Sequence, residues 1–269
     1  MAYNHNEVGS IPTEDGIIHG ATNQIYSNAE EFYRAENGHA IGYFWGFKTA
    51  GVFQNKQEIN DWIAAGNGVY QSNVQPGDVK YVDVNHDGAI DANDKVDLGN
   101  GLPKYTFGLN LNLGYKGFDL SLNATGAAGF QIAQSYRDPN SSQSNYSRQI
   151  LDRWTGEGTS NRIPRVTYGD VGNWQFSDLY LQDGDYIRLQ NITLGYDFKR
   201  LISWKGLSKL RLYVQAQNLF TLTKYDGMDP EIGSFNGTDG NNNDTWVSGV
   251  DMGYYPHPRT FIVGINLAF

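Results

Sequence analysis

The 269-residue sequence predicts an all-β fold, namely a portion of an antiparallel transmembrane β-barrel with long extracellular loops. Three observations lead to this prediction. The last eleven residues, 259–269, place apolar side chains at every second position, which is typical of a strand with one apolar face. Comparable alternation recurs in four earlier segments, and the connections between these segments alternate between short and long. A tilted strand of about 9 to 11 residues is long enough to cross a bilayer in a barrel.

The composition agrees with this fold class. Only 39% of the residues are hydrophobic and no run of about 18 apolar residues occurs, so the sequence predicts neither a transmembrane helix nor an N-terminal signal peptide. Barrel strands escape hydropathy analysis because only alternate residues meet lipid. Cysteine is absent, which removes disulfides and thiol catalysis. The formal net charge of −9 opposes binding to nucleic acid, which requires basic surfaces.

The first candidate strand, residues 41–53, has the weakest pattern. Tyr43, Trp45 and Phe47 share a face, but Phe44 and several glycines interrupt the alternation. We predict that this segment forms a sixth barrel strand, in addition to the tail and the four segments with clear alternation.

Residues 105–115 and 118–126 alternate without a fault, and only Lys116 and Gly117 separate them. Two residues ending in glycine favour a tight hairpin turn of the primed type. The two segments are therefore predicted to form an antiparallel hairpin.

Two further strands are predicted at residues 186–198 and 207–218. The alternation of the first slips near Gln190, which predicts a β-bulge. In the second, leucine and valine alternate with Lys209, Arg211 and two glutamines. A charged and amide-rich second face fits a water-filled lumen.

The connections between the predicted strands are of two kinds. The short ones are 116–117 and roughly 199–208, and the long ones are 54–104, 129–185 and 220–258. Since outer-membrane barrels place short turns in the periplasm and long loops outside, the C-terminus is predicted to be periplasmic. Short helices are predicted in the long loops at 57–65 and 144–155, and a mobile polar segment at 236–245.

Residues 83–94 match the calcium-binding loop of EF-hands. Ca²⁺ prefers about six to eight oxygen ligands, and such a loop supplies them at fixed positions around a sharp turn, here at Gly88. The predicted ligands are the side chains of Asp83, Asn85, Asp87, Asp91 and Asp94 and the carbonyl of Ala89. An alternative is a metal-free turn rich in Asp and Asn. We expect a structural clip rather than a switch, because extracellular calcium modules are usually saturated.

Several segments together resemble the C-terminal part of SusC/RagA-type TonB-dependent outer-membrane transporters. They occur in the same order and extend over nearly the whole chain. These segments are residues 41–53, 76–88, 186–196, 217–225, 229–231 and 255–261, the last of which leads into the tail.

This resemblance implies a barrel of roughly 22 strands with an N-terminal plug, which imports glycan or peptide fragments with energy passed through TonB. It implies a SusD-like lipoprotein as a partner. It also implies that the last strand is read by the barrel-assembly machinery, with Phe261 and Phe269 at the signal positions. Compared with that family, we expect the chain to lack the plug, the segment that contacts TonB, the export signal and most of the strands, because about six strands cannot close a barrel with a lumen for such cargo. We therefore expect a C-terminal barrel fragment that lies in outer-membrane lipid.

Aromatic residues of the long loops are candidates for contact with a sugar substrate, namely Trp174, Tyr180, Trp246 and Tyr254. An alternative is that they pack within the loops or at the membrane interface. No catalytic residue is predicted, so the protein is not expected to be an enzyme. The 29 acidic residues make chance carboxylate pairs inevitable, and the five histidines lack zinc-ligand spacing.

A rival hypothesis is a secreted, soluble β-sandwich that is stabilised by calcium and binds carbohydrate. The two hypotheses differ in where the apolar faces of the strands lie. In a sandwich these faces share a dry core, whereas in a barrel they meet lipid. Leu109, Leu122, Leu212 and Val263 distinguish the two, according to whether they are buried together or exposed on one face.

Overall fold

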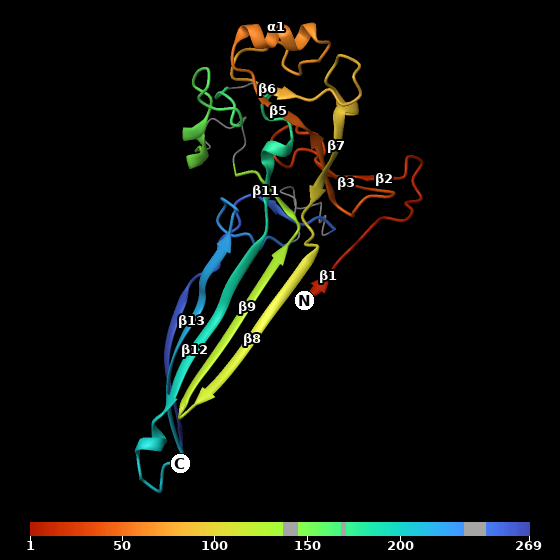
Figure 1. Ribbon diagram of the computed structural model, residues 1–269. Coiled ribbons are helices and arrows are strands. Elements are labelled where there is room, and N and C mark those ends of the chain that lie inside the picture. Colours follow the sequence, from red (N-terminus) through yellow and green to blue (C-terminus); the bar gives the residue numbers. More distant parts are fainter. Residues whose placement is uncertain (137–144, 168–170, 234–245) are drawn as a thin grey trace.

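The computed structural model describes residues 1–136, 145–167, 171–233 and 246–269. One long sheet extends away from a group of shorter sheets and loops (Figure 1). We call the first the long sheet. We call the second the cap, and it comprises the described residues of 4–104, 129–185 and 224–259. The C-terminus lies at the end of the long sheet that is remote from the cap (Figure 1).

The long sheet has the strand order β1-β8-β9-β12-β13-β15, and all neighbours are antiparallel. Its strands are β1 (Ala2–Tyr3), β8 (Tyr105–Tyr115), β9 (Phe118–Ala128), β12 (Tyr186–Asp197), β13 (Lys209–Thr223) and β15 (Thr260–Ala268). Apart from β1, these strands contain 9 to 15 residues, which is sufficient to cross a bilayer. The five strands predicted from clear alternation are confirmed.

One face of the long sheet is apolar and uncovered. Leu109, Leu212 and Val263 are 57%, 41% and 81% exposed, and Leu122 is half-buried. These side chains share no dry core, because no second sheet packs against this face among the described residues. The arrangement is the one expected of a lipid-facing surface, and the sandwich hypothesis is not supported.

The opposite face of the long sheet is polar. Asn123 Nδ2 donates to Asn110 Oδ1 over 2.6 Å, and Arg211 forms a two-point ion pair with Asp119. This ion pair crosses β12 at Gly195, where a Cβ atom would lie 2.6 Å from both Arg211 Nε and Asp119 Oδ1. Glycine at this position therefore allows an ion pair to join β9 and β13 across the strand between them.

The predicted hairpin turn and bulge are both present. Lys116 and Gly117 adopt φ angles of 48° and 94°, as a type I′ turn requires of its two central residues. The register of β12 against both of its neighbours shifts between Leu189 and Asn191. On β13, Asn218 lies opposite this bulge with a φ of 50°.

The cap contains three smaller sheets. The largest has the order β2-β3-β4-β7, made of β2 (Ile17–His19), β3 (Tyr33–Glu36), β4 (Tyr43–Phe47) and β7 (Lys95–Asn100). The second pairs β5 (Thr49–Val52) with β6 (Val79–Tyr81). The third has β10 (Gln131–Gln134) between β11 (Leu181–Asp183) and β14 (Val250–Asp251).

The prediction of a sixth strand of the set at 41–53 was wrong. This segment forms β4 and β5 in the cap and does not join the long sheet. Tyr43, Phe44 and Phe47 are all fully buried, although they do not share one face. Because protein covers β4 on both sides, its sequence lacks the two-residue alternation of a strand with one exposed face.

The core of the cap joins segments from three long connections. Phe32, Tyr33 and Phe44 pack with Phe176 and Val247 in one buried cluster, and the rings of Phe32 and Phe176 lie 4.9 Å apart. The loops therefore form a packed body with its own apolar core.

Helices are few and short. The helix predicted at 57–65 is confirmed as α1 (Lys56–Ala64), and the one predicted at 144–155 is present as the short 3₁₀ helix η2 (Arg148–Asp152). The other 3₁₀ helices are η1 (Ala92–Asp94), η3 (Asp178–Tyr180) and η4 (Phe198–Leu201). In the described ranges, no helix combines the length and the hydropathy needed to cross a bilayer. The segment 236–245, predicted to be mobile, lies outside the described residues.

Nitroxide labels on single cysteines at positions 111 and 112 should report opposite environments in bilayers. The chain contains no native cysteine, so each label is unique. We expect dissolved oxygen to relax the label at Leu111→Cys and a water-soluble nickel complex to relax the label at Asn112→Cys, because neighbouring residues of β8 face opposite sides. Leu122→Cys and Ser121→Cys, their partners on β9, provide a matched repeat. Equal accessibility at neighbouring positions would contradict a lipid-facing surface.

Candidate functional site

The predicted calcium loop, 83–94, connects β6 to β7 and bends at Gly88, whose φ is 83°. The first and last predicted ligands, Asp83 and Asp94, are only 3% and 0% exposed. The remaining predicted ligand residues are all exposed, namely Asn85, Asp87, Ala89 and Asp91.

Backbone N–H groups engage both buried carboxylates of this loop. His86 and Gly88 donate to Asp83 at 2.6 and 2.8 Å, and two other backbone groups donate to Asp94 at 2.8 and 2.9 Å. Neither carboxylate forms an ion pair with a described basic side chain. Within the described residues, no three His, Cys, Asp or Glu side chains converge as a metal cluster. The all-oxygen donor set fits a hard cation, and calcium stays a prediction.

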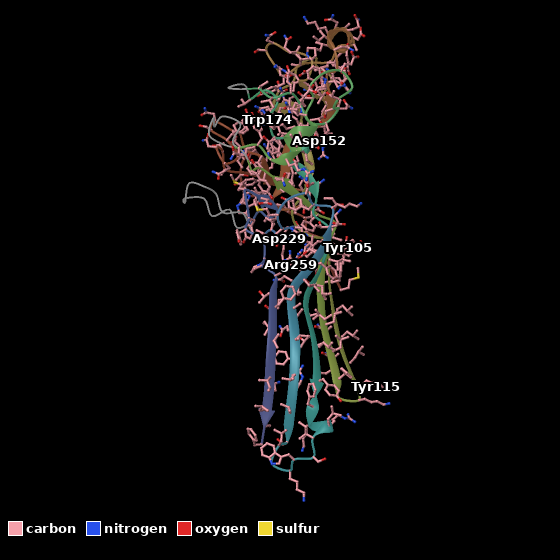
Figure 2. All side chains as sticks on the ribbon, turned by 90° about the vertical axis from the view of Figure 1, so that its left-hand side faces the viewer. Tyr105, Tyr115, Asp152, Trp174, Asp229 and Arg259 are labelled. Atoms are coloured by element: carbon pink, nitrogen blue, oxygen red, sulfur yellow. The ribbon has the colours of Figure 1, made fainter. Side chains whose placement is uncertain are left out.

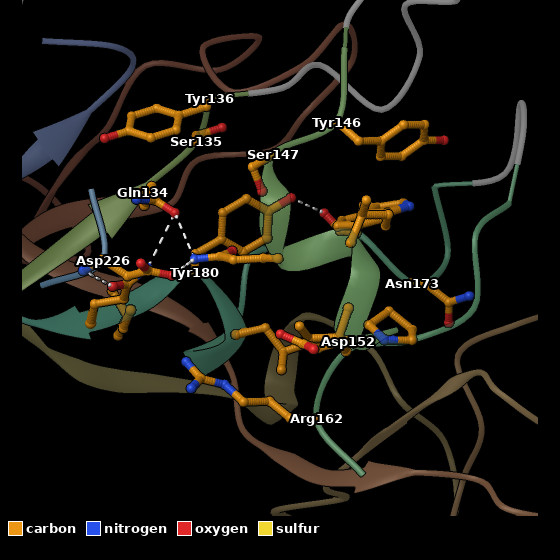
Figure 3. A pocket seen from close by; sticks show the side chains of 18 of the residues that line it. Gln134, Ser135, Tyr136, Tyr146, Ser147, Asp152, Arg162, Asn173, Tyr180 and Asp226 are labelled. Carbon is orange, nitrogen blue, oxygen red and sulfur yellow. Dashed lines mark hydrogen bonds between the residues drawn. The ribbon is translucent and has the colours of Figure 1, made fainter. Parts of the chain in front are cut away.

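A pocket of about 540 Å³ opens in the cap where β10, β11 and η2 approach one another (Figure 3). Aromatic residues Trp174 and Tyr180 line it together with the amide side chains of Gln134, Gln149 and Gln182. The Tyr180 hydroxyl donates to the Trp174 carbonyl at 2.8 Å. The structure thus brings two of the four predicted substrate-contact residues together.

The polar side of this pocket is held by side-chain hydrogen bonds. Gln149 donates to Asp226 at 3.0 Å, and Gln182 donates to Gln134 at 3.1 Å. In Figure 3, Gln134 and Asp226 lie to one side of Tyr180. The charged residues of the lining are Asp152, Asp183, Asp226, Arg162 and Lys224. Three acidic and two basic groups leave the lining nearly neutral.

The other two predicted substrate-contact residues lie outside the pocket lining. Trp246 packs against the cap core, with its ring 5.3 Å from that of Tyr33. Tyr254 is 51% exposed, beside the end of β14. For Trp246 the structure supports the alternative interpretation, which is packing within the loops.

A buried arginine joins the long sheet to the cap. Arg188 of β12 is 3% exposed and forms ion pairs with Asp229 and with Glu231, the latter at 2.7 Å. Its Nε donates to Thr221 Oγ1 at 3.0 Å, and the His257 N–H donates to Asp229 at 3.1 Å. We call these five residues the arginine clamp. Its members belong to segments 186–196, 217–225, 229–231 and 255–261, so segments that are far apart in the sequence meet here.

The clamp stabilises the charged form of its buried acid. Burial alone would raise the pKa of Asp229, but N–H groups of Glu231 and His257 and the Arg188 guanidinium hold this pKa below its usual value. The buried pair therefore stays ionised, and each charge depends on the other.

The two predicted assembly-signal residues lie on or beside the last strand. Phe261 of β15 is 72% exposed and pairs with Ala216 on the apolar face. Phe269 follows β15, is 82% exposed, and lies 6.2 Å from Trp204, measured between ring centroids. Their exposure is compatible with recognition by another protein, which stays a prediction.

No protein-family model matches the chain, whereas curated proteins do. TonB-dependent receptor P3 of Formosa agariphila is 31% identical over 269 residues, which cover 99% of this chain and 26% of the receptor. TonB-dependent receptor SusC of Bacteroides thetaiotaomicron is 28% identical over 278 residues, which cover 100% of this chain and 24% of SusC. The chain is homologous to TonB-dependent receptors, among them SusC.

Solved structures give the same fold for this receptor homologue. The RagAB peptide importer in its closed-closed state superposes with a TM-score of 0.67 at 20% identity, over 99% of this chain and 26% of that one. Its open-open state gives a TM-score of 0.65 at 18% identity, with the same coverage. The chain thus shares the fold of part of the RagAB importer. The homologue spans about a quarter of the length of these relatives.

Sequence reasoning on this receptor homologue missed the pocket glutamines and the clamp. Gln134, Gln149 and Gln182 all lie in the long connection 129–185, and no regular spacing links them. Arg188 did leave a signal, because it is a charged residue beside the predicted bulge at Gln190. A charge in a half-buried strand requires a partner, and its partners lie in segments already noted for the resemblance.

Replacing Arg188 by methionine should lower the free energy of unfolding of the membrane-inserted protein by about 3–5 kcal/mol, because it leaves Asp229 buried without its partner. A matched control is Arg211→Met, whose partner Asp119 has a side chain that is 40% exposed. We expect the control to cost about 0–1 kcal/mol. Urea unfolding in phospholipid vesicles measures both changes. Equal losses in the two variants would show that the buried clamp contributes no more to the free energy of unfolding than the exposed pair of Arg211 and Asp119 does.

Proposed function

We propose that this receptor homologue forms part of an outer-membrane importer for oligosaccharide or peptide fragments. The observation that supports this most directly is a membrane-length sheet, polar on one face, that ends in a cap with a ligand-sized pocket. Homology to TonB-dependent receptors favours transport at the outer membrane over catalysis. Because the chain spans about a quarter of its relatives, transport is proposed for the whole receptor.

The proposed partners follow from the same homology. A SusD-like lipoprotein would cover the cap, and the relationship to SusC and the RagAB fold supports this partner. TonB would deliver energy through the N-terminal region that the resemblance implies. The barrel-assembly machinery would recognise the strand that ends at Phe269. We propose that the short turns and the C-terminus face the periplasm, because barrels direct their long loops outward.

The pocket lining favours an uncharged polar ligand. Its acidic and basic groups nearly cancel, while its amide side chains offer both donors and acceptors.

Neutral oligosaccharides combine these requirements best, because hydroxyl groups match the amides and the apolar face of a sugar ring can pack on Trp174 or Tyr180. We therefore propose neutral oligosaccharides as the ligand class of the pocket. Short peptides are the second candidate, since RagAB, whose fold is shared, is described as a peptide importer.

Isothermal titration should detect binding of a neutral hexasaccharide to the protein in lipid nanodiscs. The probes are glucan and mannan hexamers, a hexauronate and hexa-alanine. Trp174→Ala should weaken binding about tenfold through the lost aromatic contact, whereas Trp62→Ala on α1, outside the pocket lining, should not. Tighter binding of the hexauronate would contradict an uncharged ligand. Binding of hexa-alanine alone would favour the peptide alternative, and insensitivity to Trp174→Ala would exclude the pocket.

We also propose that residues 83–94 bind Ca²⁺ as a structural clip. The buried carboxylates of Asp83 and Asp94 have no basic partner among the residues that the structure describes, and a divalent cation would balance their charge. The same hydrogen bonds that close the loop would hold it ready for the ion. The loop connects β6 to β7, so an ordered loop would help to hold these two strands of the cap in place.

Calcium should bind with a Kd of about 10⁻⁴ to 10⁻³ M, as in extracellular calcium modules, and should slow proteolysis of the cap. Asp83→Asn should abolish both effects, while Asp61→Asn on the exposed side of α1 should abolish neither. Calorimetry and limited trypsin digestion, with and without calcium, provide the measurements. An absence of binding heat in the unmodified protein would leave the metal-free turn as the correct interpretation.

A further inference from the structure

The end of the long sheet remote from the cap is basic, although the protein as a whole is acidic. Residues 112–122, 193–212 and 263–269 form this end and contain six basic and two acidic residues, a formal charge of +4. The remaining 14 basic and 27 acidic residues carry −13, so that the total is −9. The charge of the protein is therefore strongly segregated along the long sheet.

The basic residues converge in space at the two short turns. The Asp197 N–H donates to the Gly117 carbonyl at 2.8 Å, which joins the turn after β12 to the hairpin turn at 116–117. A Cβ atom on Gly117 would lie 2.7 Å from the Arg200 side chain, so Arg200 lies against that hairpin turn. Lys209 begins β13 and pairs with Ala268 near the C-terminus. Figure 1 shows these turns and the C-terminus at the same end of the molecule.

The described residues provide no ion-pair partner for these cations. Lys116, Arg200, Lys205 and Lys209 are exposed, and neither they nor Lys199 form an ion pair within the described part of the chain. We call these five residues the basic collar. The Lys199 ammonium donates to the backbone carbonyls of Ile202 and Trp204, at 3.2 and 2.6 Å. The other four are free to meet an anionic partner.

Exposed aromatic side chains accompany the basic collar. Tyr115, Phe118, Trp204 and Phe269 are 70%, 54%, 59% and 82% exposed, and Tyr115 lies near the end of the long sheet (Figure 2). Tyrosine and tryptophan are enriched where hydrocarbon meets the polar headgroups of a bilayer. The collar residues lie in the same two turns as the side chains of this aromatic row or next to them.

We propose that the basic collar binds the headgroups of anionic glycerophospholipids in the leaflet at the short-turn end. This rests on the membrane-spanning long sheet and holds whatever ligand the pocket takes. Lysine and arginine side chains are long enough to reach phosphates while their stems stay against apolar surface. Lipids surround the aromatic row on the apolar face, so their headgroups are the nearest partners. The interaction would fix the depth of the sheet in the bilayer.

The test is the association of spin-labelled phosphatidylglycerol, relative to spin-labelled phosphatidylcholine, with the protein reconstituted in phosphatidylcholine bilayers. The collar variant is Arg200→Gln, Lys205→Gln, Lys209→Gln. A matched control is Lys48→Gln, Lys56→Gln, Arg148→Gln, three exposed cations of the cap. The unmodified protein and the control should prefer phosphatidylglycerol. The collar variant should lose this preference, by up to about fivefold for each cation removed.

A salt titration of the unmodified protein tests the same proposal without any substitution. The preference for phosphatidylglycerol should fall as sodium chloride rises from about 0.01 to 1 M, since the Debye length shrinks from about 30 to 3 Å. No preference in the unmodified protein at low salt would overturn the proposal. So would an equal loss in the control variant, or a collar variant that keeps its lipid preference. This last result would show that the lipid preference arises outside the collar.

Discussion

Hydrocarbon offers no hydrogen-bond partner, and this constraint shapes the long sheet. Every backbone N–H and C=O within a bilayer must be paired inside the protein. The sheet meets this demand with antiparallel ladders that run from β8 through β9, β12 and β13 to β15. Strands held in this register must turn alternate side chains to lipid, so one face is apolar and the other is free to be polar. The chemistry of both faces follows from the pairing of the backbone.

The arginine clamp shows how the cap is attached to that ladder. The bulge beside Leu189 lies at the cap end of β12, where the register no longer has to be continuous. Arg188 lies next to it on the polar face, and Asp229 and Glu231 reach it from the connection that follows β13. A buried charge without its partner costs several kcal/mol. The buried ion pair between Arg188 and Asp229 therefore helps to fix the position of that connection.

The sequence predicted those features that are encoded locally. Alternation predicted the five long strands, and a slip in it predicted the bulge. The same rule failed at 41–53, because β4 is covered on both sides and its neighbours Tyr43 and Phe44 are both buried. The pocket could not be predicted, since Gln134, Gln149 and Gln182 lie far apart within the connection from β9 to β12 and meet only after that connection has folded. Local periodicity contains no information about such contacts.

The long sheet and the pocket differ in how much of each this chain supplies. Along the edges of the long sheet, at β15 and along most of β8, the described residues provide no partner strand, and in hydrocarbon these backbone groups need one. Six strands also cannot surround a lumen wide enough for an oligosaccharide. The lining described for the pocket, in contrast, comes from this chain, within a cap that has its own apolar core. Ligand recognition by the pocket is therefore a property that this chain can be tested for, whereas passage across the membrane requires a closed barrel.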